Sequence, residues 1–247
     1  MNFLNKLFGS KAESQKVENT DFCMNYMNKF LILTFTCLLY IACSSVQDCK
    51  EGINLLPMYG KLTKCAAQIK SDNDFFASVD SKFSDRKTAA VSYIDMAWEY
   101  FYKNDLESSM KRFNQAWLLD STNADVYWGF GNLLGRQNEL EESIYFFEKS
   151  LKINPFNPRV YESQATSYGQ LFSMDQDLNT LNKAIESLRK ANTLDKDNPR
   201  ILAQLTAAYS YFYQKDSANK YLNLTDKIDP QAVHPQVREL LEQKNKR

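Results

Sequence analysis

Several kinds of residue are scarce in this sequence, and each shortage argues against a class of function. The chain has one histidine, His234, so a histidine-based catalytic triad or a zinc site is disfavoured. Only 7 glycines and 6 prolines argue against a low-complexity chain. Lysine plus arginine number 30, as do aspartate plus glutamate, so the charge balance gives no reason to expect nucleic acid as a partner.

Recognised catalytic motifs are also missing. Gly129, Gly131 and Gly135 lack the spacing of a dinucleotide-binding fingerprint and fall inside a predicted helix, where Gly131 is interpreted as a packing glycine. His234 precedes Pro235 at a predicted helix entrance, which favours a capping or surface role. The sequence shows no phosphate loop, nucleophile motif or metal-ligand constellation. We therefore predict no enzymatic activity, no cofactor and no metal.

An internal repeat is the most informative feature that is present. Residues 90–157 contain one pattern written twice, so that Phe113 in the first copy is matched by Phe147 in the second. Each copy divides into two amphipathic halves. The first copy divides at Asn104, and the second copy divides at Asn138. The repeating unit is therefore predicted to be a helical hairpin.

This unit resembles the tetratricopeptide repeat, a helical hairpin with a period of about 34 residues. In that family the first helix sets a small residue among large ones, and the second helix alternates small and aromatic residues. The small positions let paired helices approach to about 8 to 10 Å. The matching residues are Tyr93, Met96, Ala97, Tyr100, Ser109, Phe113 and Ala116, and then Tyr127, Phe130, Gly131, Leu134, Ser143, Phe147 and Ser150.

Three serines stand where the family usually has alanine, namely Ser109, Ser143 and Ser150. Serine is nearly as small as alanine, and its hydroxyl can bond to the carbonyl one turn back in the same helix. We interpret these serines as tolerated substitutions and not as a new site.

The resemblance implies an all-α solenoid of about four tetratricopeptide-type hairpins with a capping helix at each end. An apolar stripe between Ser71 and Phe83 predicts the N-terminal capping helix, and Pro235 begins the C-terminal one. The third hairpin is longer than the others by an insertion around 172–178. The predicted segments are an upstream extension (1–26), a signal peptide (27–43), a linker and N-terminal capping segment (44–85), the repeat domain (86–230, with repeats at about 90–123, 124–157, 158–198 and 199–230) and a C-terminal capping helix (231–247).

A secretory signal is predicted to begin near Met24 or Met27. One basic residue, Lys29, precedes a hydrophobic run over 30–41, and small residues and Cys43 follow it. This arrangement resembles the lipobox of bacterial lipoproteins, in which Cys43 would be acylated. An uncleaved anchor or a buried helix are the other readings, although a membrane span needs about 20 apolar residues.

The lipobox resemblance implies a protein of the bacterial cell envelope, lipid-anchored at the outer membrane or on the periplasmic side. Cys49 and Cys65 would then be the two cysteines of the mature chain that carry no lipid. An oxidising periplasm allows them to form a disulfide, and two small, partly buried thiols are the alternative.

The binding surface is predicted from the same resemblance. In tetratricopeptide proteins the first helix of each hairpin lines a concave groove. Trp98 and Trp128 lie outside the family's core positions, so both are expected to be partly exposed and to anchor a bound segment. Alternatively, a capping helix or the N-terminal loop folds over them. The predicted groove positions are Ile94, Trp98, Phe101, Tyr102, Asp125, Trp128, Asn132, Arg136, Arg159, Glu162, Thr166 and Arg200.

The predicted function is an envelope-tethered scaffold that binds a peptide or helix of a protein partner in this groove. A structural subunit of a constitutive envelope complex is the first alternative. A glycan-binding or hydrolytic protein on a repeat scaffold is the second, and the sequence supplies no residues for it. The carboxylate clamp of chaperone-binding members is excluded, because Ile94 and Trp98 stand where that clamp has lysine and asparagine.

Overall fold

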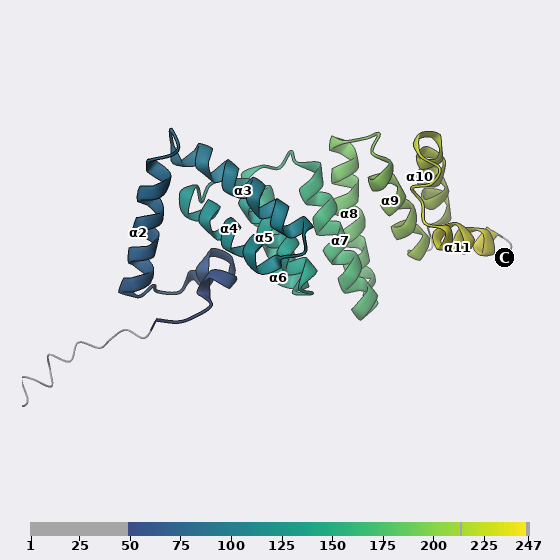
Figure 1. Cartoon of the computed structure of the whole chain (residues 1–247). Coiled ribbons are helices and arrows are strands. Elements are labelled where there is room, and N and C mark those ends of the chain that lie inside the picture. The colour runs from purple at the N-terminus through teal and green to yellow at the C-terminus, as the bar shows by residue number, and fades with distance from the viewer. Residues whose placement is uncertain (1–48, 213, 246–247) are drawn as a thin grey trace, which may run out of the picture. The chain divides into compact units, whose positions relative to one another are not determined.

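The computed structural model describes residues 49–212 and 214–245 of the chain (Figure 1). These residues lie in one compact unit. The predicted signal peptide, both candidate start residues and the predicted lipid attachment at Cys43 lie outside the described residues.

Every regular element in the described residues is helical. Successive α-helices pack as hairpins, α3 with α4, α5 with α6, α7 with α8 and α9 with α10, so the all-α solenoid of the tetratricopeptide type is confirmed. Figure 1 shows α2 at one end of the array and α11 at the other. The elements are η1 (Ile53–Leu55), η2 (Pro57–Lys61), α2 (Ala66–Asp80), α3 (Arg86–Tyr102), α4 (Leu106–Leu119), α5 (Ala124–Arg136), α6 (Leu140–Ile153), α7 (Pro158–Asp175), α8 (Leu178–Leu194), α9 (Pro199–Tyr211), α10 (Lys215–Ile228) and α11 (Pro235–Asn245).

Local sequence explains where the helices begin and end. Asn104 and Asn138 occupy the left-handed region with φ of 60° and 65°, a conformation that asparagine tolerates better than most residues. The residue after each asparagine donates its N–H back to Tyr100 or Leu134, which closes the preceding helix. The predicted divisions of the hairpins are thus confirmed. The side chains that accept a backbone N–H at a helix start are Asp85, Asp105, Asn123, Asn157, Asp177 and Asn198.

Two buried phenylalanines fit into notches made by glycine. Phe113 is 0% exposed and Phe147 is 1% exposed. A Cβ atom on Gly129 would lie 2.1 Å from the Phe113 ring, and one on Gly131 would lie 2.5 Å from the Phe147 ring. Neither glycine can carry a side chain without displacing an aromatic ring. The packing role predicted for Gly131 is confirmed, and Gly129 has the same role.

The three serines bond differently from the prediction. Ser109 donates to the Ala97 carbonyl in α3 at 2.9 Å, and Ser150 donates to the Ala124 carbonyl in α5 at 2.9 Å. The Ser143 hydroxyl lies 2.9 Å from that of Ser167 in α7. All three bonds join different helices, so the predicted bond to the same helix is wrong. The hydroxyls face a neighbouring helix at close approach, where they satisfy polar groups that packing has buried.

The third hairpin is elongated, as the sequence predicts. Its helices α7 and α8 have 18 and 17 residues, whereas α5 and α6 have 13 and 14. Gln176 ends α7 in the left-handed conformation with φ of 55°. The predicted insertion therefore adds turns to the end of α7 and the start of α8.

Helix α2 covers the exposed end of the first hairpin. Its Val79 is buried in a cluster with Ala89 and Ala90 of α3, and the Phe75 ring lies edge-on to the Tyr93 ring at 5.3 Å. The predicted capping helix is confirmed, but it runs from Ala66 to Asp80. Phe83 therefore lies in the following turn and not in the helix, although it still packs against the same cluster.

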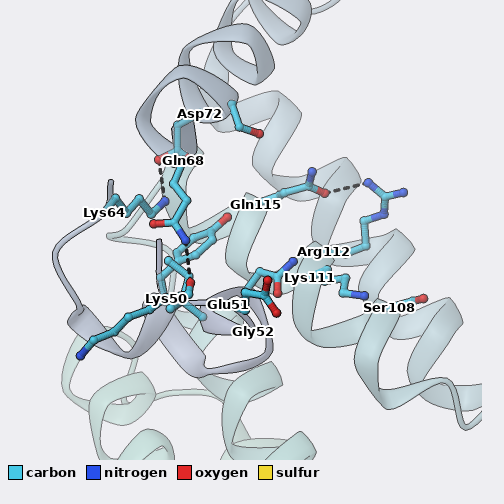
Figure 2. Close-up of a pocket in the computed structure, with 14 residues that line it drawn as sticks. Lys50, Glu51, Gly52, Lys64, Gln68, Asp72, Ser108, Lys111, Arg112 and Gln115 are labelled. Carbon is cyan, nitrogen blue, oxygen red and sulfur yellow. Dashed lines mark hydrogen bonds and ion pairs between the residues drawn. The ribbon is translucent and has the colours of Figure 1, made fainter. Parts of the chain in front are cut away.

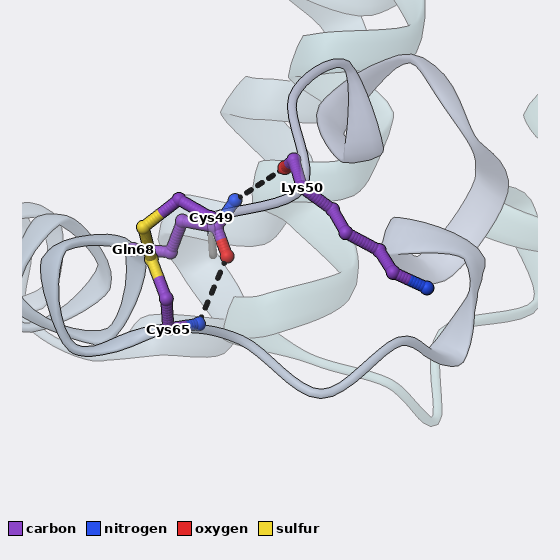
Figure 3. Close-up of a disulfide and its surroundings, with 4 residues drawn as sticks. All are labelled: Cys49, Lys50, Cys65 and Gln68. Atoms are coloured by element: carbon purple, nitrogen blue, oxygen red, sulfur yellow. Dashed lines mark hydrogen bonds between the residues drawn. A yellow bond between two sulfur atoms is a disulfide. The ribbon is translucent and has the colours of Figure 1, made fainter. Parts of the chain in front are cut away.

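The segment before α2 is fixed by a disulfide and by the outer helix α4. Cys49 and Cys65 are disulfide-bonded (Figure 3), which decides between the two predicted alternatives. The buried Asn114 of α4 donates to the carbonyls of Asn54 and Leu56, both at 2.9 Å. This loop therefore packs on the second helix of the first hairpin.

At the C-terminus, α11 packs against α9 and α10 through the buried Leu241 and the neighbouring Val237. His234 is exposed, and its Nδ1 accepts the N–H of Gln236 at 3.3 Å, as expected for a residue at a helix entrance. None of the helices in the described residues is long and apolar enough to cross a membrane.

Candidate partner-binding surface

The first helices of successive hairpins contact one another, α3 with α5 and α5 with α7, and form the inner layer of the solenoid. Four side chains of this layer, Trp98, Phe101, Tyr102 and Trp128, form what we call the aromatic patch. The Trp98 ring lies 4.6 Å from the Trp128 ring and 6.0 Å from the Tyr102 ring, onto which it stacks. Tyr102 is 78% exposed, and the two tryptophans are half-buried. The structure thus brings together the aromatic residues predicted for the site.

The members of the patch differ in how they meet the core. Trp98 lies edge-on to the buried Phe113 ring at 5.3 Å, and Phe101 also packs against the core cluster. Because Gly129 has no side chain, the Phe113 ring reaches between α3 and α5 and touches Trp98. The prediction that both tryptophans are partly exposed is confirmed, but Trp98 supports the core as well. Trp128 instead donates its indole N–H to the Ser163 hydroxyl at 3.0 Å, a partner that the sequence did not predict.

Arg136 places a positive charge over one edge of the patch. Its guanidinium carbon lies 5.5 Å from the centre of the Phe101 ring, within the range of a cation–π interaction. The guanidinium also donates to the Asn104 side chain at 2.7 Å. Asn132, one turn before Arg136, donates its amide to the Trp128 carbonyl at 2.8 Å and is half-buried. Asn132 therefore lies at the patch as predicted, with one donor already used.

Arg159, in the first turn of α7, interacts electrostatically with Asp125 of α5. Burial raises the pKa of Asp125, and the Arg159 charge opposes that effect. Arg159 is exposed, and the salt bridges between described residues include neither it nor Arg136. Neither guanidinium group therefore has a carboxylate oxygen within salt-bridge distance among the described residues.

Two predicted groove residues are instead part of the interior. Ile94 is 5% exposed and belongs to the core cluster of the first two hairpins. Glu162 is 7% exposed and accepts hydrogen bonds from Arg200 at 2.7 Å and Gln204 at 3.0 Å. These bonds link α7 to α9, so neither Ile94 nor the Glu162 carboxylate can contact a ligand directly. Thr166 donates to the Glu162 carbonyl within its own helix.

Arg200, in the first turn of α9, is engaged by acidic side chains of the chain itself. The hydrogen bond to Glu162 is the main cause that raises the pKa of Arg200, and the negative charges of Glu162 and Asp195 contribute smaller parts.

A separate hollow of about 400 Å³ lies between the disulfide-bonded loop, α2 and α4 (Figure 2). Lys64 pairs with Asp72 at 2.5 Å and lies 3.4 Å from the centre of the Tyr59 ring. Burial, with a smaller contribution from Asp72, raises the pKa of Tyr59. Arg112 donates to Gln115 at 2.7 Å. Several polar groups of this hollow are thus paired with one another. In the described part of the chain, no group of three or more His, Cys, Asp or Glu residues could hold a metal ion.

Comparison with known proteins identifies which fold the chain shares. Residues 124–157, the second hairpin, match the tetratricopeptide repeat family model. No curated protein sequence matches the chain.

Solved structures with the same arrangement are distant in sequence. PilF of Pseudomonas aeruginosa has a TM-score of 0.55 and 18% identity over 65% of this chain and 71% of its own. A thermophilic tetratricopeptide-repeat protein of Thermus thermophilus has a TM-score of 0.52 and 11% identity over 62% of this chain and 80% of its own. The Cut9–Hcn1 hetero-tetramer of the APC/C has a TM-score of 0.53 and 12% identity over 62% of this chain, but only 29% of its own chain is covered. These likenesses establish the fold of a tetratricopeptide-repeat protein.

Proposed function

We propose that this tetratricopeptide-repeat protein binds a segment of a partner protein on its inner face, with the aromatic patch at the centre of the contact. The observation that carries the proposal is the patch itself, in which stacked rings remain accessible beside a guanidinium group that has no carboxylate partner among the described residues. Aromatic and arginine side chains dominate interface energies because they bury large areas with few rotatable bonds. Cut9, a structural relative, is solved in a complex with another protein, Hcn1.

Site-specific photo-crosslinking tests this proposal. Tyr102, which is 78% exposed, would be replaced by p-benzoylphenylalanine in the full chain, and the matched control carries the same replacement at Tyr145, which is 43% exposed on the outer helix α6. On irradiation in cells, we expect one or a few discrete protein adducts from position 102 and none of these from position 145. Adducts of equal pattern from both positions, or none from position 102, would contradict binding at the patch.

We further propose that a lipid on Cys43 tethers the protein to the bacterial cell envelope. The support is the sequence around Cys43, where a basic residue and a hydrophobic run precede a small residue and the cysteine. The Cys49–Cys65 disulfide adds support, because disulfides persist in oxidising compartments such as the periplasm. The groove would then face partners at or near a membrane surface.

Metabolic labelling with a fatty acid tests the tether. Cys43→Ala is expected to abolish the label and to leave a longer, unprocessed chain, since the acylated thiol is missing. Cys49→Ala removes the disulfide but not the predicted lipid-bearing thiol, so it should keep the label. Label that persists on Cys43→Ala would rule out lipidation there and favour an uncleaved anchor.

A further inference from the structure

The Cys49–Cys65 disulfide joins two cysteines that differ in their access to solvent. Cys49 is exposed, whereas Cys65 is 3% exposed and lies directly before the first residue of α2. The bond closes the disulfide-bonded loop (residues 49–65), which packs on α4 through η1 and η2. A dissolved thiol can therefore reach the Cys49 sulfur more readily than the Cys65 sulfur.

The position of Cys65 favours its release as a thiolate. Cys65 is the N-cap of α2, a helix of 15 residues. The first N–H groups of a helix have no carbonyl partner within it, and the helix dipole favours a negative charge at that end. Thiolates are stabilised at helix N-termini for this reason. Because a stabilised thiolate leaves faster in thiol–disulfide exchange, Cys65 is the better leaving group of the pair.

The disulfide-bonded loop contains a stretch of backbone that is unfavourable by itself. Met58, Tyr59 and Lys61 have φ of 54°, 56° and 53°, and Gly60 among them has φ of 62°. All of these residues lie in the left-handed region, which glycine adopts freely and other residues adopt at a cost in conformational energy. Such residues persist only where the surrounding structure holds them. Residues 58–61, which we call the left-handed stretch, therefore favour release of the loop.

Non-covalent contacts also hold the disulfide-bonded loop in place. The buried Met58 belongs to the core cluster of the first two hairpins, and Asn114 of α4 donates to two carbonyls of the loop. At the ends of the loop, the Gln68 amide accepts the Cys65 N–H at 3.0 Å and donates to the Lys50 carbonyl at 2.8 Å (Figure 3). The disulfide is the covalent part of this clamp, so its redox state controls how firmly the strained loop is held.

We propose that the Cys49–Cys65 disulfide is a redox switch, which a thiol reductant opens and which thereby releases the disulfide-bonded loop from α4. A thiolate of the reductant attacks the Cys49 sulfur, the S–S bond breaks, and its electron pair leaves with the Cys65 sulfur. A second thiolate attacks the reductant's sulfur in the mixed disulfide and releases Cys49. The two cysteines gain two electrons and the protons of the two reductant thiols, and those thiols become one disulfide.

Opening of the switch changes the outer surface of the first hairpin. Without the loop, the buried Asn114 exchanges its partners at Asn54 and Leu56 for water, and the seat of Met58 in the core cluster becomes accessible. The hollow in Figure 2 also loses the wall that the loop provides. The aromatic patch belongs to α3 and α5, so this inference does not depend on partner binding there.

Equilibration of the purified full chain with mixtures of reduced and oxidised glutathione tests the chemistry. After acid quenching and alkylation, mass spectrometry of the peptides that contain Cys49 and Cys65 gives the reduced fraction in each mixture. We expect half reduction within the range that glutathione buffers, because the Cys65 thiolate and the left-handed stretch both favour the open form. A disulfide that stays oxidised across this range would be structural only, which would overturn the inference.

Lys61→Asn tests the contribution of the left-handed stretch. Lys61 is exposed, and asparagine tolerates the left-handed region better than lysine, so the closed loop should be less strained. At a fixed glutathione mixture, the ratio of reduced to oxidised protein should fall about threefold or more. The matched control is Lys82→Asn, at an exposed lysine whose φ is not positive, and it should leave the ratio unchanged. Equal ratios for Lys61→Asn and the wild type would contradict a switch that strain helps to open.

Hydrogen–deuterium exchange of the full chain measures the release of the loop. With dithiothreitol, the hydrogen-bonded amides of Leu55, Leu56 and Tyr59 should exchange at least about tenfold faster than in the oxidised protein. Cys49→Ser should show this faster exchange with and without dithiothreitol, while the amides of α5 and α6 keep their rates in every sample. Unchanged exchange in the reduced loop would overturn the switch. Faster exchange throughout the chain would also overturn it, because the disulfide would then hold the whole fold and not the loop.

Discussion

Phe113→Ala is expected to lower the free energy of unfolding by about 3 to 5 kcal/mol, the usual cost of truncating a fully buried aromatic side chain. The Phe113 ring is 0% exposed and fits over Gly129 in the next hairpin. It also meets the rings of Trp98 and Phe130 edge-on, at 5.3 and 6.2 Å. Alanine would leave a cavity between two hairpins, and the helical backbone at Gly129 cannot move in to close it. Urea unfolding followed by far-UV circular dichroism measures the loss.

The matched control is Phe156→Ala. Phe156 lies in the turn between α6 and α7 and is 75% exposed, so its removal should change the unfolding free energy by less than about 0.5 kcal/mol. The second-repeat equivalent, Phe147→Ala, should behave like Phe113→Ala because Phe147 is 1% exposed over Gly131. A loss below about 1 kcal/mol for Phe113→Ala would contradict the repeat register, since a buried aromatic side chain costs more than that.

The features that follow from short-range pattern were predictable from the sequence. The hairpin turns at Asn104 and Asn138, the paired phenylalanines and the packing glycine all repeat at one period, so one copy supports the interpretation of the other. The N-terminal capping helix was predicted from its apolar stripe, but its start was placed several residues late. Residues 66–70 carry little of that stripe, and Gln68 instead bonds to the backbone N–H of Cys65 at the helix entrance.

The features that depend on contacts between hairpins were not predictable. The sequence around Glu162 does not indicate that Arg200 and Gln204, from the next hairpin, donate hydrogen bonds to its carboxylate. Likewise, Ile94 was assigned to the groove from the family's positions, but the close approach of α3 and α5 buries it. A hollow of about 580 Å³ between α7, α8 and α9 combines an insertion that was recognised with small residues, Gly169 and Ala207, whose consequence appears only when the three helices are packed together.

Tyr102→Ala combined with Trp128→Ala is expected to weaken partner binding at least about a hundredfold, since two central aromatic contacts each contribute about 2 kcal/mol or more. These two residues are the members of the aromatic patch that do not pack against the buried core clusters. Trp98→Ala is avoided because it would also remove a ring that supports Phe113. The double variant loses the Trp128–Ser163 hydrogen bond, at a cost in stability of about 1 kcal/mol.

The control for this binding measurement is Tyr145→Ala. It removes a ring that is 43% exposed on the outer helix α6, and both partner affinity and fold should be unchanged. Circular dichroism and thermal melting of all variants establish that any loss of affinity arises in a folded protein.

The central claim is tested most directly with the partner that is captured by crosslinking from position 102. The measurement is the affinity of this partner for three proteins: the wild type, the double variant and the Tyr145→Ala control. Titration calorimetry with the purified partner is expected to give equal dissociation constants for the wild type and the control, and one at least about a hundredfold larger for the folded double variant. A folded double variant whose dissociation constant stays within about threefold of the wild type would contradict binding on the inner face.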